Sequence, residues 1–102
     1  MRGRMWPKDE GVDIACSHAG RMHTLRFRYC LDADLRVRLF VCGVVDGAVA
    51  RAEVVRDRVV SSSPAHARLI RACMANARPV LAQALQRYVA KFTPRQRQLL
   101  RF

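Results

Sequence analysis

Arginines recur at every second position in two consecutive stretches of the sequence. The sheet-face cluster, as we call it, comprises Arg26, Arg28, Arg36, Arg38 and Arg51 together with Phe40. Alternation of apolar and polar residues with a period of two is typical of strands that bury one face. We therefore expect these side chains on the open face of a sheet. Guanidinium groups bind phosphate and aromatic rings stack on bases, so the cluster predicts a nucleic-acid-binding surface.

The expected strand register gives this cluster two possible interpretations. Arg28 is expected directly opposite Arg38, and like charges so placed are destabilising unless something offsets them. A bound polyanion would do so. The same registers place Asp13 opposite Arg26 and Asp57 opposite Arg36, so acids can also neutralise part of the face. An anion-binding platform and a solvated, partly paired surface both remain open.

The charge balance is strongly basic. The chain of 102 residues has 19 Lys and Arg against 8 Asp and Glu, a formal net charge of +11. Such an excess attracts nucleic acid, anionic membranes or acidic proteins. Only Lys8 and Lys91 are lysines. The preference for arginine resembles the coding bias of a GC-rich genome, so the net charge, and not the choice of arginine, is the evidence.

Metal binding and catalysis find little support in the sequence. The four cysteines form no Cys-x-x-Cys pair, and Cys30 and Cys42 are expected out of register on adjacent strands. Cys16, His18 and His23 lie around one turn without a fourth ligand. No glycine-rich phosphate loop is present, and no carboxylate is expected beside a histidine. We expect no metal, no cofactor and no enzymatic activity.

The elements that position the cluster follow from alternation and turns. Strands are expected from Val12, over residues 24–31 and 35–42, and over 48–60, where helical spacing is the alternative. Turns at 18–21, 32–34 and 46–47 connect them. In the resulting registers apolar residues face each other, as in Ile14 with Leu25, Phe27 with Leu39, and Val41 with Ala52. The sequence predicts a four-stranded antiparallel meander.

A helical segment follows the sheet. Ser63 is a suitable N-cap and Pro64 a suitable first helical residue. Apolar residues then recur at helical spacing as far as Phe92. A straight helix over 64–92 would be about 43 Å long, against a diameter of roughly 35 Å for a compact domain of this size. Because Pro79 also removes a helical hydrogen bond, we expect a kink or break near it, with both halves covering the apolar sheet face.

The domain organisation follows from these elements. Residues 1–11 are expected to form a flexible basic arm and residues 12–102 a single α+β domain. The basic N-terminus has no apolar run behind it, and no stretch is long enough to span a bilayer. The four cysteines are therefore expected as reduced thiols, which predicts a cytoplasmic protein.

The order of four strands and one helix, over residues 12–92, resembles small single-stranded-DNA-binding coactivator domains that dimerise through a kinked C-terminal helix. The resemblance concerns topology and transfers no residues. The primary hypothesis is a small basic protein that binds nucleic acid with little sequence dependence. The alternative is a protein-interaction or homodimerisation module that docks an acidic partner or a second copy. Its basis is the apolar content of the C-terminal helical segment, which includes Tyr88, Val89, Phe92, Leu99, Leu100 and Phe102.

Overall fold

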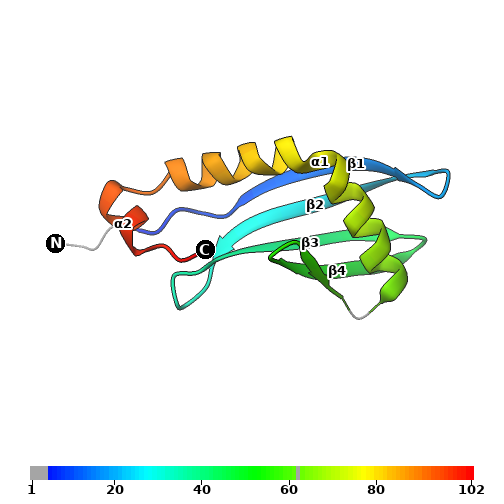
Figure 1. The fold of residues 1–102 in the computed structure, drawn as a ribbon, viewed down its shortest axis with the longest axis horizontal. Coiled ribbons are helices and arrows are strands. Elements are labelled where there is room, and N and C mark those ends of the chain that lie inside the picture. The colour runs from blue at the N-terminus through cyan, green and yellow to red at the C-terminus, as the bar shows by residue number, and fades with distance from the viewer. Residues whose placement is uncertain (1–4, 62) are drawn as a thin grey trace.

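The computed structural model describes residues 5–61 and 63–102 and shows an elongated α+β arrangement, 53 × 24 × 22 Å (Figure 1). Its elements are β1 (Glu10–His18), β2 (Arg21–Leu31), β3 (Val37–Val45), β4 (Ala48–Val55), β5 (Arg58–Val60), α1 (Pro64–Ala90) and α2 (Pro94–Leu99). The five strands pair with their sequence neighbours in the order β1-β2-β3-β4-β5, all antiparallel. The predicted fold class is confirmed, with one short strand more than expected.

The region expected as one strand, residues 48–60, is divided by a turn. Arg56 and Asp57 adopt positive φ angles of 50° and 66°, and β5 folds back so that Val55 pairs with Arg58. Asp57 therefore lies in the turn and not on a strand. The expected pairing of Asp57 with Arg36 is wrong for this reason.

The register of the β2–β3 hairpin also differs from the expectation, by two residues. Leu31 pairs with Val37, and Phe27 pairs with Val41. The connection is longer than expected because the Asp32 carboxylate accepts hydrogen bonds from two later backbone N–H groups, at 2.8 and 3.0 Å. A slip of two residues keeps every side chain on its own face. Matching apolar residues across the hairpin therefore cannot distinguish the two registers.

The other two predicted registers are confirmed. Ile14 pairs with Leu25 in the first hairpin, and Val41 pairs with Ala52 in the third. Both turns are tight two-residue turns that contain Gly20 or Gly47 at positive φ. Glycine adopts this left-handed conformation without steric cost, so the turn positions could be located from the sequence.

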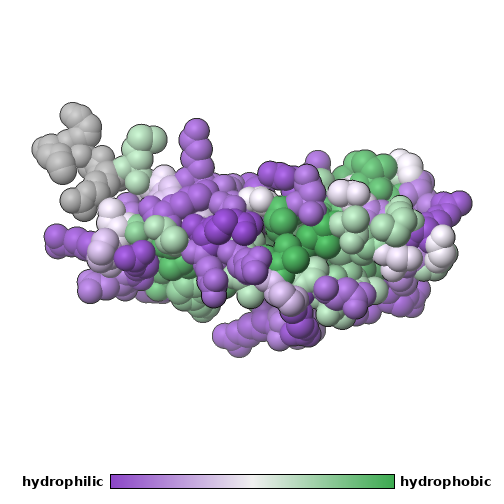
Figure 2. Space-filling view, turned by 90° about the horizontal axis from the view of Figure 1, so that it is seen from above, coloured by the Kyte–Doolittle hydropathy of each residue, from purple (hydrophilic) through white to green (hydrophobic). Residues whose placement is uncertain are grey.

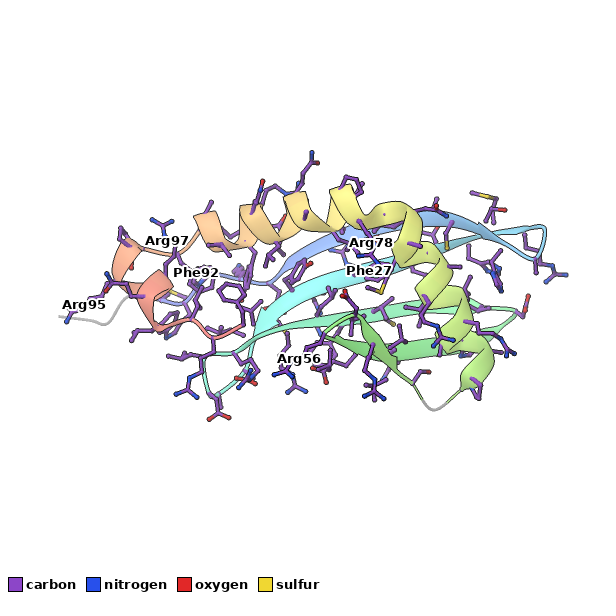
Figure 3. The ribbon with its side chains drawn as sticks, viewed as in Figure 1. Phe27, Arg56, Arg78, Phe92, Arg95 and Arg97 are labelled. Atoms are coloured by element: carbon purple, nitrogen blue, oxygen red, sulfur yellow. The ribbon has the colours of Figure 1, made fainter. Side chains whose placement is uncertain are left out.

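Helix α1 is continuous through Pro79 and bent instead of broken. The Ser63 hydroxyl accepts a hydrogen bond from the backbone N–H of His66, and Pro64 opens the first turn, as expected. The helix changes direction part-way along (Figure 1), in the region of the labelled Arg78 (Figure 3). The proline ring crowds the preceding turn and removes one hydrogen bond. The bend lets the first half cross the sheet while the second half runs beside β1.

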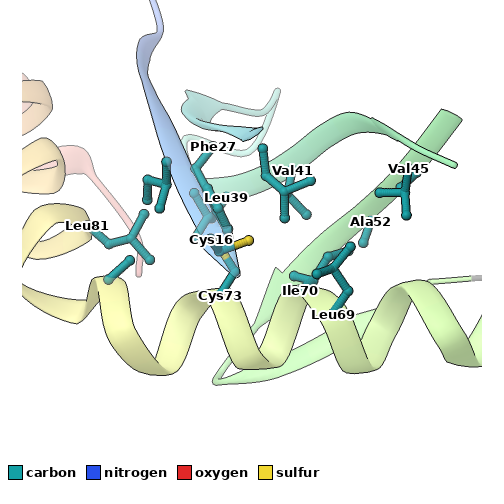
Figure 4. Close-up of a cluster of buried hydrophobic side chains, with 14 residues drawn as sticks. Cys16, Phe27, Leu39, Val41, Val45, Ala52, Leu69, Ile70, Cys73 and Leu81 are labelled. Atoms are coloured by element: carbon teal, nitrogen blue, oxygen red, sulfur yellow. The ribbon is translucent and has the colours of Figure 1, made fainter. Parts of the chain in front are cut away.

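The main core lies between α1 and one face of the sheet (Figure 4). Leu25 and Phe27 of β2 and Ile70 of α1 have no exposed surface. Burying a side chain of this size contributes about 1.5–3 kcal/mol. Cys16 and Cys73 are both buried and lie side by side in this core, where they pack as small apolar groups.

A second apolar cluster lies under the C-terminal half of α1. Tyr88 and Phe92 are buried and meet edge to face, with ring centroids 5.0 Å apart. Trp6 packs on Phe92 at 6.0 Å. The N-terminal segment thus packs against the end of α1 and the residues that follow it. Glu10 and Gly11, which were predicted to lie in the arm, belong to β1. Residues 1–4 of the predicted arm lie outside the described residues.

Among the described residues, every helix is too short or too polar to cross a lipid bilayer.

Candidate anion-binding surface

The sheet brings the sheet-face cluster onto the face opposite α1. Across the strands, Arg26 aligns with Cys42 and Arg51, while Arg28 aligns with Phe40 and Glu53. Side chains alternate between faces along a strand, so the residues that flank Phe27 and Leu39 point away from the core. Arg26, Arg28 and Arg51 are exposed, whereas Arg38 and Phe40 are half-buried.

Acidic residues pair with three of the five clustered arginines. The guanidinium of Arg38 donates two hydrogen bonds of 2.6 Å to the carboxylate of Glu53. The other two pairs are Arg26 with Asp13 at 3.0 Å and Arg28 with Asp9 at 2.6 Å. The hydrogen bond from Arg38 lowers the pKa of Glu53. The predicted pairing of Arg26 with Asp13 is confirmed, whereas the pairs of Arg28 with Asp9 and Arg38 with Glu53 were not expected from the sequence.

The prediction that Arg28 and Arg38 lie directly opposite each other and repel is wrong. Because of the two-residue slip, Arg28 lies opposite Phe40 and Arg38 lies opposite Cys30. The two guanidinium carbons lie 5.8 and 5.2 Å from the centroid of the Phe40 ring. Cation–π attraction of this kind is favourable. It also means that a base can stack on Phe40 only if one guanidinium moves aside.

Four arginines lie together at one end of the sheet. A hollow of about 740 Å³, which we call the arginine hollow, is lined by Arg36, Arg38, Arg56 and Arg58 with Asp32 and Glu53. Both carboxylates are already paired with Arg38, at 3.9 Å for Asp32 and 2.6 Å for Glu53.

The other three arginines of the arginine hollow have no acidic partner among the described residues. Arg36 donates a long hydrogen bond of 3.4 Å to the carbonyl of Phe102. Arg56 and Arg58 make no side-chain hydrogen bond or ion pair within that part of the chain. Arg56 projects from the turn between β4 and β5 (Figure 3). Three guanidinium groups thus share one hollow without an ion pair in the described structure, and of the three only Arg36 makes a side-chain hydrogen bond there.

Arg56 and Arg58 were not among the predicted site residues, because residues 48–60 were expected to form one strand. In a single strand both residues would fall on the core face with Ala52 and Val54. The turn at Arg56–Asp57 reverses the chain and returns Arg58 to the open face. Two consecutive left-handed residues without glycine give no strong sequence signal, so this turn could not be read from the residues.

The surplus charge also has a marked distribution along the chain. Residues 1–57 contain ten basic and all eight acidic residues, whereas residues 58–102 contain nine basic residues and no acidic one. Only Arg87 and Lys91 of these nine form ion pairs in the described structure, both with Glu10. The surface seen from the helix side is accordingly rich in hydrophilic side chains around a smaller apolar area (Figure 2). This asymmetry was readable from the sequence.

A smaller hollow of about 190 Å³ lies on the open face beside the arginine hollow. Arg26, Arg28, Phe40 and Cys42 line it. Since Arg26 and Arg28 are paired with carboxylates, this hollow offers less free positive charge than the arginine hollow. Within the sheet-face cluster, Arg26, Arg28 and Arg38 are therefore paired with carboxylates, whereas Arg36 and Arg51 form no ion pair in the described structure.

Comparisons of this chain with protein-family models, with curated proteins and with solved structures found no match.

Proposed function

We propose that this protein binds nucleic acid through the open face of its sheet, with the arginine hollow as the main phosphate-binding centre. The observation that carries the proposal is that Arg36, Arg56 and Arg58 line one hollow without an acidic partner among the described residues. Phosphate oxygens accept paired hydrogen bonds from guanidinium groups. A chain of phosphates suits several such groups on one surface better than a single small anion does.

The remaining members of the sheet-face cluster have secondary roles in this proposal. Arg38 lies between the two hollows and is held by Glu53, so it orients the site more than it neutralises phosphate. Arg51 extends the positive surface along β4, and Phe40 can stack a base only after displacing a guanidinium. Arg26 and Arg28 release their carboxylate partners before they contribute. Contacts to phosphate carry little base information, so binding is largely independent of sequence.

The basic helical half adds a long-range contribution. Nine cations without an intervening acid create a field that steers a polyanion toward the protein and raises the association rate. The protein acts by binding and not by catalysis in this proposal, and it works in the cytoplasm, where its four free cysteines stay reduced.

The test is fluorescence anisotropy with labelled single-stranded and double-stranded oligonucleotides at 50 and 200 mM salt. Each phosphate contact contributes a slope of about −0.7 in log K against log salt for single strands. The three unpaired arginines together therefore account for about a twentyfold loss of affinity over this range. The variant in which Arg36, Arg56 and Arg58 become alanine should lose that part of the salt dependence.

Arg26→Ala is the matched control, because it removes an equally exposed arginine that already pairs with Asp13. The Arg26→Ala variant should change the affinity, and the slope of log K against log salt, much less than each of the three substitutions in the arginine hollow does. Absence of salt-sensitive binding at micromolar protein would refute the proposed function. An equal effect of Arg26→Ala would refute the assignment to the arginine hollow.

A protein-interaction role, including homodimerisation through the C-terminal helical segment, is the second candidate. A groove of about 420 Å³ along α1 is lined by Leu85, Val89 and Phe102, and Phe102 is 71% exposed. Exposed apolar surface of this kind can dock a second copy or an acidic protein with an apolar patch. Light scattering behind a sizing column tests the dimer, and a monomer at high concentration counts against it.

A further inference from the structure

All three histidines of the protein line one hollow, at the end of the sheet opposite the arginine hollow. His18 ends β1, His23 lies in β2, and His66 lies in the first turn of α1. The hollow, which we call the histidine hollow, has a volume of about 300 Å³. Each histidine is half-buried. The sequence separates His66 from the other two by more than forty positions, so only the tertiary structure brings the three imidazoles together.

The imidazoles have no hydrogen-bond or ion-pair partner among the described residues. The backbone N–H of His66 donates to Ser63, but its ring makes no such contact there. The two charged residues that line the hollow, Arg21 and Asp46, pair with each other. Buried and half-buried polar groups in proteins are generally hydrogen-bonded. Three imidazoles without a partner around one hollow therefore indicate room for a ligand.

The charges around the hollow favour an anion over a cation. Arg21 and the N-terminus of α1, which carries a partial positive charge, would both repel a metal ion. The only carboxylate in the lining, that of Asp46, is already engaged by Arg21. In addition, within the described residues no three His, Cys, Asp or Glu side chains are arranged to hold a metal.

One backbone donor is also available. Ser63 accepts from the N–H groups of His66 and Ala67, at 3.4 and 3.0 Å, and Pro64 has no N–H. This leaves the N–H of Ala65, which lines the hollow, as the unpaired donor of the first turn in the described structure. A free N–H at a helix N-terminus is a favourable partner for an oxyanion.

We propose that the histidine hollow binds a small tetrahedral oxyanion of the phosphate or sulfate class, and that protonation of its imidazoles strengthens binding. This site is separate from the arginine hollow and does not depend on the proposed function. The buried side chains of Val45 and Leu69 form an apolar part of the wall, and a charge interaction is stronger beside such a wall than in bulk water. The titratable and charged groups that face the imidazoles from the packed elements are Arg21 and Asp46.

The pH dependence has a defined sign. Histidine side chains change charge between pH 5 and 8, and an oxyanion binds the charged form better. Affinity should therefore rise as pH falls. Sulfate is the first probe because its own charge does not change over this range.

The experiment follows the ring resonances of the three histidines by NMR while the full chain is titrated with sodium sulfate at pH 5.5 and 7.5. Sodium chloride at equal ionic strength is the control, and inorganic phosphate and a nucleoside 5′-monophosphate are further arms. The proposal expects saturable shifts of at least two of the three ring systems, with tighter binding at pH 5.5 than at pH 7.5. Tighter binding of the nucleotide than of phosphate would identify a terminal phosphate as the source of the oxyanion.

Variants separate this site from the nucleic-acid surface. His66→Gln should weaken sulfate binding at pH 5.5 and leave oligonucleotide affinity at pH 7.5 unchanged, while Arg58→Ala should do the reverse. Because the wild-type titration maps the site without any substitution, a variant that fails to fold does not prevent the test. Shifts that chloride reproduces, shifts that do not saturate, or tight zinc binding that displaces sulfate would each overturn the proposal.

Discussion

Replacing Glu53 by glutamine should make the protein less stable and, at the same time, a better binder of nucleic acid. The Glu53 carboxylate accepts two hydrogen bonds of 2.6 Å from Arg38, and its side chain is only 20% exposed. A charge-assisted pair of this geometry is stronger than a typical surface ion pair. We expect Glu53→Gln to lower the free energy of unfolding by about 1–2 kcal/mol, which corresponds to a fall of about 4–8 °C in Tm for each kcal/mol.

The gain in binding follows from the same contact. Without the carboxylate, Arg38 joins the three unpaired arginines of the arginine hollow and contributes one more phosphate contact. The slope of log K against log salt should steepen by about 0.7, which corresponds to about fivefold tighter binding of single strands at 0.1 M salt. Thermal unfolding and salt-dependent anisotropy on the same preparation measure the two effects.

Asp34→Asn is the matched control, because it also adds one unit of positive charge at this end of the sheet. The side chain of Asp34 makes no ion pair in the described structure. The Asp34→Asn substitution should therefore leave the free energy of unfolding nearly unchanged and raise the affinity for nucleic acid only slightly, through the change in net charge. If Glu53→Gln binds no better than Asp34→Asn, the placement of the phosphate-binding centre in the arginine hollow is wrong.

The other predictions concern stability and are measured by thermal or denaturant unfolding. Gly43→Ala should lower the free energy of unfolding by about 1–3 kcal/mol, because the added Cβ would lie 2.7 Å from a methyl group of the buried Leu25. Gly11→Ala should lower it clearly less, because the added Cβ meets only the movable end of an arginine side chain. Equal losses of stability in the two variants would contradict this prediction. Glu10→Gln should lower Tm at pH 7, because ion pairs with Lys91 and Arg87 lower the pKa of Glu10. The difference in Tm should shrink as pH falls through that lowered pKa, where the carboxylate is protonated and the contribution of the ion pairs is lost; a difference that does not change on acidification would refute it. Tyr88→Phe should be neutral or stabilising by up to about 1 kcal/mol, because the buried hydroxyl of Tyr88 has no hydrogen-bond partner in the described structure. A clear loss of stability would show that the hydroxyl is hydrogen-bonded in solution.

Much of the fold could be predicted from local patterns. The alternation of apolar residues in β1, β2 and β3, the turns at Gly20 and Gly47, and the cap at Ser63 each have a local physical cause that is visible in the sequence. Periodicity also assigned Leu25, Phe27 and Ile70 to the core correctly. The same reasoning placed the sheet-face cluster on the face away from the helix, because a period of two fixes which face each strand residue occupies.

The partners within the site depended on the tertiary structure. Two hairpin registers that differ by two residues bury the same face, so only the hydrogen bonds of Asp32 decided that Arg28 faces Phe40 and not Arg38. The turn at Arg56–Asp57, which completes the arginine hollow, likewise has no local signal.

The sequence by itself determined the fold class, the faces of the first three strands and the large surplus of positive charge, because these depend on composition and on residue spacing along the chain. The tertiary structure decided which arginines are neutralised and which histidines meet. Those outcomes depend on distances between side chains that are remote in the sequence. Charge interactions between exposed groups are screened over about 8–10 Å at physiological salt, so a register slip or a turn of two residues is enough to change them.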